Sequence, residues 1–182
     1  MPPGGSDITL GRIGGGLILL GIPALVYTSV IGADLIVPAI LLGVGAAVVS
    51  VAGPRPLDAR LTRAGLAFLA VGGLSVAVGL AIESTDAEMA DLVPVLIAVA
   101  TIPVGCLATG VSLARSSGFV RAVGAVVLSG LVLALIGEVI GLGSAGPPSA
   151  ILLLGVAVTG VGLAGVGVLT LGLTRLEGPA RA

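Results

Sequence analysis

The chain has 182 residues, of which 57% are hydrophobic and 9% are charged, with a formal net charge of −1. Soluble domains carry about 25% charged residues, so this sequence cannot cover a water-facing surface. It contains one cysteine, Cys106, and no histidine, which excludes an intrachain disulfide and the common zinc, haem and histidine-based catalytic sites. It also lacks the basic patch of a nucleic-acid-binding protein. The composition therefore indicates an integral membrane protein without a cofactor.

Apolar stretches in chain order predict six transmembrane helices. A bilayer core of roughly 30 Å takes about 20 helical residues, and the first stretch, residues 13–52, is about twice that long. We therefore place a turn at residues 32–34, which leaves Pro38 in the first turn of the next helix, where proline is tolerated. The predicted helices cover residues 13–31, 35–52, 64–82, 92–113, 122–142 and 150–173. The predicted fold is an all-α bundle of three consecutive hairpins, with a short segment 1–12 before it and a tail 174–182 after it.

The basic residues predict the orientation of this bundle. All eight are arginines, and all fall on one side of the predicted membrane: Arg12, Arg55, Arg60, Arg63, Arg115, Arg121, Arg175 and Arg181. The connections on the other side contain only acidic charges: Asp34, Glu83, Asp86, Glu88 and Asp91. Because basic loops stay in the cytoplasm, both termini are predicted to be cytoplasmic. The use of arginine without lysine favours a prokaryotic protein of the plasma membrane.

The hairpins also resemble one another. Arg55, Arg115 and Arg175 are sixty residues apart, each near the end of the second helix of a hairpin. This spacing is typical of a tandem repeat of helical hairpins. The preference for cytoplasmic arginines places basic residues at the same positions in any six-helix protein, so both explanations stay open.

Small residues predict how the helices pack, because lipid tails solvate large apolar side chains as well as a neighbouring helix does. Three predicted helices carry glycines on one face: Gly65, Gly72 and Gly79 in the third, Gly130, Gly137 and Gly141 in the fifth, and Gly155, Gly162, Gly165 and Gly172 in the sixth. These faces are suited to close contact between helices of one chain, or with a partner or a second copy. Pro23 and Pro103 lie deep inside two predicted helices and favour kinks.

Glu138 is the one ionisable residue inside a predicted span, about four residues from the outer end of the fifth helix. A charge in hydrocarbon costs several kcal/mol, which makes this carboxylate a candidate for proton or cation coupling. The same position also suits an interfacial carboxylate or a hydrogen bond between helices. The acidic residues 83–91 lack the alternating oxygen ligands of a calcium loop, so we predict a solvated surface and no metal site there.

These features favour a non-enzymatic membrane protein that acts structurally or by binding partners. Its predicted partners are the lipid bilayer and other membrane proteins or a second copy of itself, with no nucleic acid. The alternative is a small transporter or channel that uses Glu138 as its coupling carboxylate. A polar cavity lined by Glu138 would favour transport, and a solid apolar interior would favour the structural role.

Overall fold

A computed structural model describes residues 5–31, 35–52, 57, 59–83, 92–141 and 150–172, with the side chains of α1 described from Thr9 to Leu25. The described residues form six helices: α1 (Gly5–Ile31), α2 (Ile36–Ala52), α3 (Arg60–Glu83), α4 (Leu92–Ala114), α5 (Gly118–Gly141) and α6 (Ala150–Leu171). The prediction of an all-helical protein with six helices is confirmed. The predicted turn at residues 32–34, the acidic residues 84–91 and the tail 174–182 lie outside the described residues.

Four of these helices, α3 to α6, are long and apolar enough to cross a membrane, judged by length and composition. α2 and the stretch Thr9–Leu25 of α1 are shorter apolar helices. The 17 residues of α2 span roughly 26 Å, slightly less than a bilayer core of about 30 Å. The length and composition of four helices are therefore compatible with a membrane protein, whereas the described apolar stretches of the first two helices are shorter.

Three helices begin earlier than predicted, all at the end of the bundle that carries arginines. α1, α3 and α5 begin at Gly5, Arg60 and Gly118 rather than at residues 13, 64 and 122, whereas the other boundaries agree within two residues. The prediction began each helix where the apolar run begins, which marks the hydrocarbon region. A helix continues beyond it because arginine stems lie along apolar surface while the guanidinium groups reach water.

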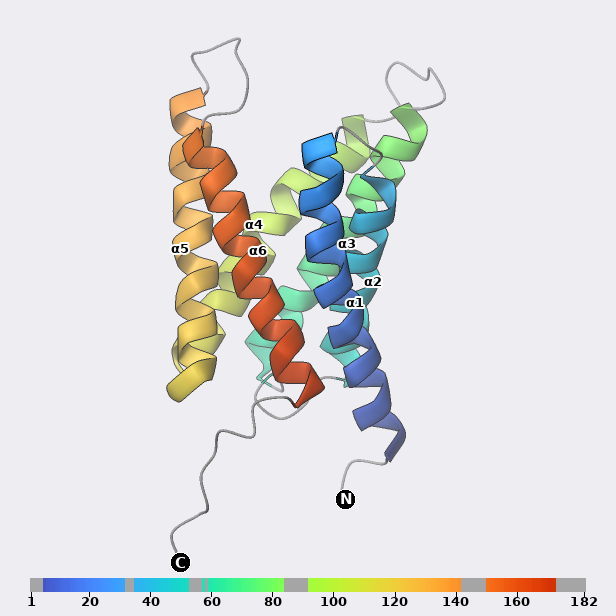
Figure 1. The fold of residues 1–182 in the computed structure, drawn as a ribbon, viewed down its shortest axis with the longest axis vertical. Helices are drawn as coiled ribbons and strands as arrows, with labels where there is room; N and C mark the ends of the chain where they lie inside the picture. Colours follow the sequence, from blue (N-terminus) through green and yellow to red (C-terminus); the bar gives the residue numbers. More distant parts are fainter. Residues whose placement is uncertain are drawn as a thin grey trace, which may run out of the picture.

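The six helices form a closed ring (Figure 1). Each helix packs against its predecessor and its successor, and α6 returns to pack against α1. α2 packs on α3 about as extensively as on α1, whereas α5 and α6 pack mainly on each other and less on α4 and α1. The ring therefore consists of a four-helix group, α1 to α4, and an α5–α6 hairpin joined to it at two weaker seams.

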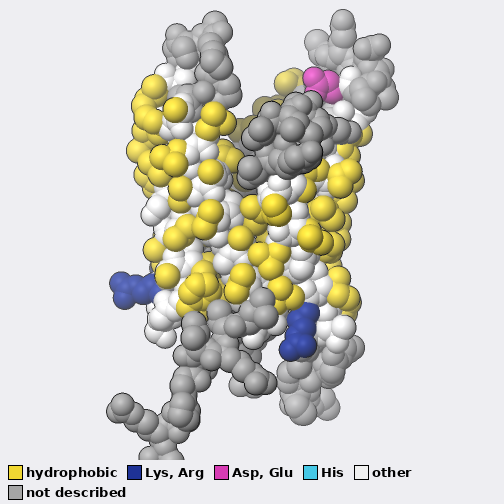
Figure 2. Space-filling view, in the orientation of Figure 1, with side chains coloured by type: hydrophobic (Ala, Val, Ile, Leu, Met, Phe, Trp, Pro, Cys, Tyr) yellow, Lys and Arg dark blue, Asp and Glu magenta, His cyan; other side chains and the backbone are white. Residues whose placement is uncertain are grey.

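Charged side chains mark the two ends of the ring (Figure 2). The described arginines lie near one end, which we call the arginine end, and Glu83 and Glu138 lie near the other, the acidic end. Arg55, Arg175 and Arg181 and the acidic residues Asp34, Asp86, Glu88 and Asp91 lie outside the described residues. The sixty-residue repeat and the cytoplasmic location of the arginine end therefore stay predictions.

The apolar core is concentrated in the half of the ring next to the arginine end. Its buried residues come from all six helices and from the α2–α3 connection: Ile18, Ala46, Val49, Leu57, Leu66, Leu69, Ala70, Cys106, Leu113, Val123, Val127, Leu131, Val166 and Leu169. None of these described core residues belongs to the last two turns of a helix at the acidic end.

One stripe of α4 shows how the packing changes along the ring. Residues seven apart lie on nearly the same face of a helix. Along this stripe, Leu113 and Cys106 are 0% and 2% exposed, whereas Val99 and Leu92 are 65% and 57% exposed. The same face is thus buried near the arginine end and uncovered near the acidic end. Figure 1 shows the α5–α6 hairpin leaning away from the other helices in that direction.

Candidate functional site

Most of the predicted packing glycines lie where two helices touch. A Cβ atom added at Gly65, Gly72, Gly130, Gly137, Gly155, Gly162 or Gly165 would lie closer than 3.0 Å to an atom of the neighbouring helix. Contacts that short do not occur for real Cβ atoms, so these positions require glycine or a shift of the neighbour. Gly79 is also buried. These glycines hold α3 against α4 and α5 against α6.

Two of the predicted packing glycines, Gly141 and Gly172, do not lie at a close contact between helices. A Cβ atom at Gly141 or Gly172 would meet no other heavy atom within 4 Å. Gly172 follows the last residue of α6 with a φ of 67°, and its N–H donates a hydrogen bond to the Leu169 carbonyl at 3.2 Å. The seven-residue spacing between Gly165 and Gly172 predicted a packing stripe. In the structure, Gly172 instead adopts the left-handed backbone conformation that ends α6, which glycine accommodates without strain.

Pairs of facing glycines at most seams were not predicted from the sequence. Five of the six seams bring two glycines together across the contact: Gly14 and Gly45, Gly43 and Gly73, Gly65 and Gly105, Gly110 and Gly124, and Gly15 and Gly167. The sixth seam, between α5 and α6, places Gly155 against Ala134 and Gly137 against Leu152. The sequence contains the glycines but not the pairing, because partners lie on different helices. The seams therefore depend on backbone approach around the whole ring.

Threonine hydroxyls fill several of the spaces that these glycines leave. Thr109 faces Gly65, Thr159 faces Gly130 and Thr170 faces Gly15. The hydroxyls of Thr159 and Thr170 donate to carbonyls of their own helix, Gly155 at 2.9 Å and Gly167 at 2.7 Å.

The α3–α4 seam adds a hydrogen bond between helices and one unpaired hydroxyl. The Thr62 hydroxyl donates to Ser112 Oγ at 2.7 Å, joining the two helices near the arginine end. Thr109 is fully buried, and its hydroxyl has no hydrogen-bond partner among the described residues. Leaving a buried hydroxyl unpaired costs about 1–3 kcal/mol, so the close approach at Gly65 is favourable enough to offset it.

Glu138 lies on the inward face of α5, at the acidic end. It is seven residues beyond Leu131 and eleven beyond Val127, so the three side chains share one stripe of the helix. Leu131 and Val127 are buried in the core, whereas Glu138 is exposed. Its exposure comes from the opening of the ring at this end. The described arginines all lie at the opposite end, too far away to pair with it.

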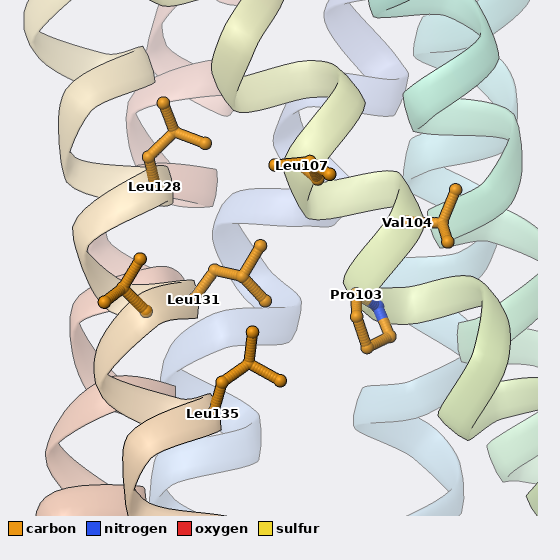
Figure 3. A pocket seen from close by; sticks show the side chains of 7 residues that line it. Pro103, Val104, Leu107, Leu128, Leu131 and Leu135 are labelled. Atoms are coloured by element: carbon orange, nitrogen blue, oxygen red, sulfur yellow. The ribbon is translucent and has the colours of Figure 1, made fainter.

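An apolar groove of about 220 Å³ lies between α4 and α5. In Figure 3, Leu107 of α4 points toward Leu128, Leu131 and Leu135 of α5 across the groove, whereas the Val104 side chain points away from α5. The groove is lined by Pro103, Val104, Leu107, Leu128, Leu131, Val132 and Leu135. Every lining residue is apolar and Glu138 is not among them, so this groove is not the polar cavity that a coupling carboxylate needs. Pro103 lies within α4 as expected, beside the place where the two helices separate.

The described residues offer little reactive chemistry elsewhere. No group of three His, Cys, Asp or Glu side chains suited to a metal ion occurs among them. Cys106 is a free, buried thiol in the apolar core.

Comparison with known proteins gives no relative from which a role could be transferred. No protein-family model matches the chain, and neither a curated protein nor a solved structure matches it. The fold itself defines the class: an all-helical protein with four helices long and apolar enough to span a membrane.

Proposed function

We propose that this protein is a non-enzymatic integral membrane protein that acts structurally and by binding other membrane components. The main support is the apolar core near the arginine end, to which all six helices contribute. Leu57, Leu66 and Leu113 are fully buried there, at the end where an ion would have to leave the ring. Moving a charge past these buried apolar side chains costs several kcal/mol.

The open acidic half supports the partner-binding part of this proposal. Val99 of α4, Leu135 of α5 and Val156 of α6 are about half exposed or more. Val99 and Val156 continue the faces that bury Cys106 and Gly167 nearer the arginine end. Apolar side chains that the chain leaves uncovered there are available to lipid or to another membrane protein. Binding through apolar surface requires no catalytic group.

Glu138 supports transport as a second candidate function. It lies on the inward stripe of α5, and the ring is open at its level and closed at the arginine end. One open and one closed end are what a transporter shows in one state of alternating access. In this reading the α5–α6 hairpin would move against the four-helix group, with Glu138 carrying the proton or cation.

Replacing Glu138 with glutamine distinguishes the two functions. We expect the parent protein in proteoliposomes to show no proton flux, and Glu138→Gln to unfold within about 0.5 kcal/mol of the parent because the side chain is exposed. Flux is measured with a pH-sensitive dye inside the vesicles under an imposed pH gradient. A parent flux that disappears in a folded Glu138→Gln variant would establish transport and overturn the preferred function.

Thiol labelling tests the proposed orientation in a prokaryotic plasma membrane. In a Cys106→Ala background, we expect a cysteine at Ser84 to react with an impermeant reagent added to intact cells, and one at Ser117 to react only after lysis. Ser84 is the residue after Glu83 in the sequence, and Glu83 ends α3 at the acidic end. Ser117 is exposed between α4 and α5 at the arginine end. Reaction of the Ser117 position in intact cells would reverse the orientation.

A further inference from the structure

The groove between α4 and α5 shares a helix face with an arginine. Arg121, Leu128 and Leu135 are spaced by seven residues on α5, so they form one stripe, and the two leucines line the groove. Arg121 is exposed near the first turn of α5. Leu128 lies roughly 10 Å further along the helix and Leu135 roughly 21 Å. A positive charge therefore lies at the arginine end of the apolar stripe.

Arg115 adds a second positive charge at the same end. It follows the last residue of α4 and is exposed. Arg115 therefore lies in the short connection between α4 and α5, at the arginine end of the seam that contains the groove. The described carboxylates with known side-chain placement, Glu83 and Glu138, lie at the acidic end. No described acidic side chain therefore neutralises the two guanidinium groups.

We propose that the groove binds one acyl chain of an anionic phospholipid from the leaflet on the arginine side, with Arg121 and Arg115 holding its phosphate. The depths agree, because a leaflet contributes about half of a 30 Å core and the groove lies roughly 10–20 Å from the arginine level. Guanidinium groups bind phosphate through paired hydrogen bonds. Basic pockets between membrane helices bind anionic headgroups in this way.

The size of the groove favours an acyl chain over a helix of another protein or of a second copy. One turn of a helix with its side chains, about 10–12 Å across and 5.4 Å long, occupies roughly 400–600 Å³, more than the groove of about 220 Å³. A lipid chain is narrow and flexible enough to enter between Leu107 and Leu131. The bound chain would fill the gap beside Pro103 and strengthen the weaker seam between α4 and the α5–α6 hairpin.

This inference rests on the proposed function, since it names a lipid as one partner of a partner-binding protein. Its test uses a single fluorophore, because the chain contains no tryptophan. Leu107→Trp places an indole at the groove, and Phe68→Trp places one on an exposed position of α3 in the same half of the ring. Each variant is reconstituted in phosphatidylcholine bilayers that contain a minor fraction of phosphatidylglycerol with brominated acyl chains, which quench a nearby indole.

We expect brominated phosphatidylglycerol to quench the indole of Leu107→Trp more strongly than that of Phe68→Trp. Its binding constant relative to phosphatidylcholine should be raised about fivefold per arginine. Adding Arg121→Gln should reduce this excess, whereas adding Arg60→Gln, at an exposed arginine of α3, should leave it unchanged. Brominated phosphatidylcholine should show no excess at either position.

Equal quenching at the two positions, or an excess that Arg121→Gln leaves intact, would overturn the inference. An equal excess with brominated phosphatidylcholine would also overturn it, because the site would not select an anionic headgroup. Protection of the groove indole from every brominated lipid would show that a polypeptide covers it. Circular dichroism confirms the helical fold of each variant. A proton flux that depends on Glu138 would instead defeat the proposed function and leave the quenching result standing.

Discussion

Gly155→Ala is expected to lower the free energy of unfolding by about 2–3 kcal/mol, or to prevent the α5–α6 hairpin from packing. The new Cβ would lie 2.6 Å from the Ala134 Cα atom and 2.7 Å from the Leu133 carbonyl carbon. These are backbone atoms, which cannot rotate away as a flexible side chain can. The two helices would therefore have to separate along their most extensive contact.

Gly16→Ala is the matched control for this substitution. It also replaces a glycine inside a helix, but a Cβ atom at Gly16 would meet nothing within 4 Å. Alanine is favoured over glycine in a helix by up to about 1 kcal/mol, so the control should be neutral or slightly stabilising. Unfolding is followed by circular dichroism as a denaturing detergent is titrated into mixed micelles. Equal stability of the two variants would mean that the α5–α6 seam is looser than described.

Leu113→Ala and Leu92→Ala should differ strongly, although both truncate leucine on one stripe of α4. Leu113 is 0% exposed and Leu92 is 57% exposed. Truncating the buried leucine leaves a cavity that costs about 2–5 kcal/mol, since its neighbours relax only in part. At Leu92, lipid replaces the lost methyl groups, and the effect should stay within about 0.5 kcal/mol.

The same mixed-micelle unfolding measures this pair. A large loss of stability in Leu92→Ala would show that the acidic half is packed as tightly as the arginine half. The open faces of α4, α5 and α6 would then be closed in the membrane, and the partner-binding surface would be lost. Parent-like stability of Leu113→Ala would contradict the apolar layer near the arginine end.

The sequence predicted the helices well because their existence depends on local composition. The run of apolar residues after Leu92 needs no information from elsewhere in the chain to form α4. Helix starts at the arginine end were less predictable, because Arg60 extends α3 beyond its apolar run. The ring closure was not predictable at all. It depends on Gly15 meeting Gly167, two residues far apart in the sequence that carry no mark of their pairing.

The candidate site was predicted in part, for a similar reason. Glu138 was identifiable as a charge within an apolar stretch, but its inward face became apparent only beside the buried Leu131 and Val127. The groove combines Pro103 of α4 with Leu128 of α5. The sequence predicted a kink at Pro103 but indicated no role for Leu128. Grooves between helices arise where packing fails to close, which depends on tertiary geometry and not on composition.

The seam between α1 and α6 has a consequence for how the protein is made. Gly15 and Leu19 of α1 contact Thr170 and Gly167 of α6, which are synthesised much later. The intervening stretch of about 155 residues takes roughly 8–30 s to synthesise at 5–20 residues per second. Throughout that time the α6-facing side of α1 has no partner within the chain. Until α6 is made, this side of α1 is in contact with lipid or with a factor that accompanies nascent membrane helices. That contact must be weak enough for α6 to displace it.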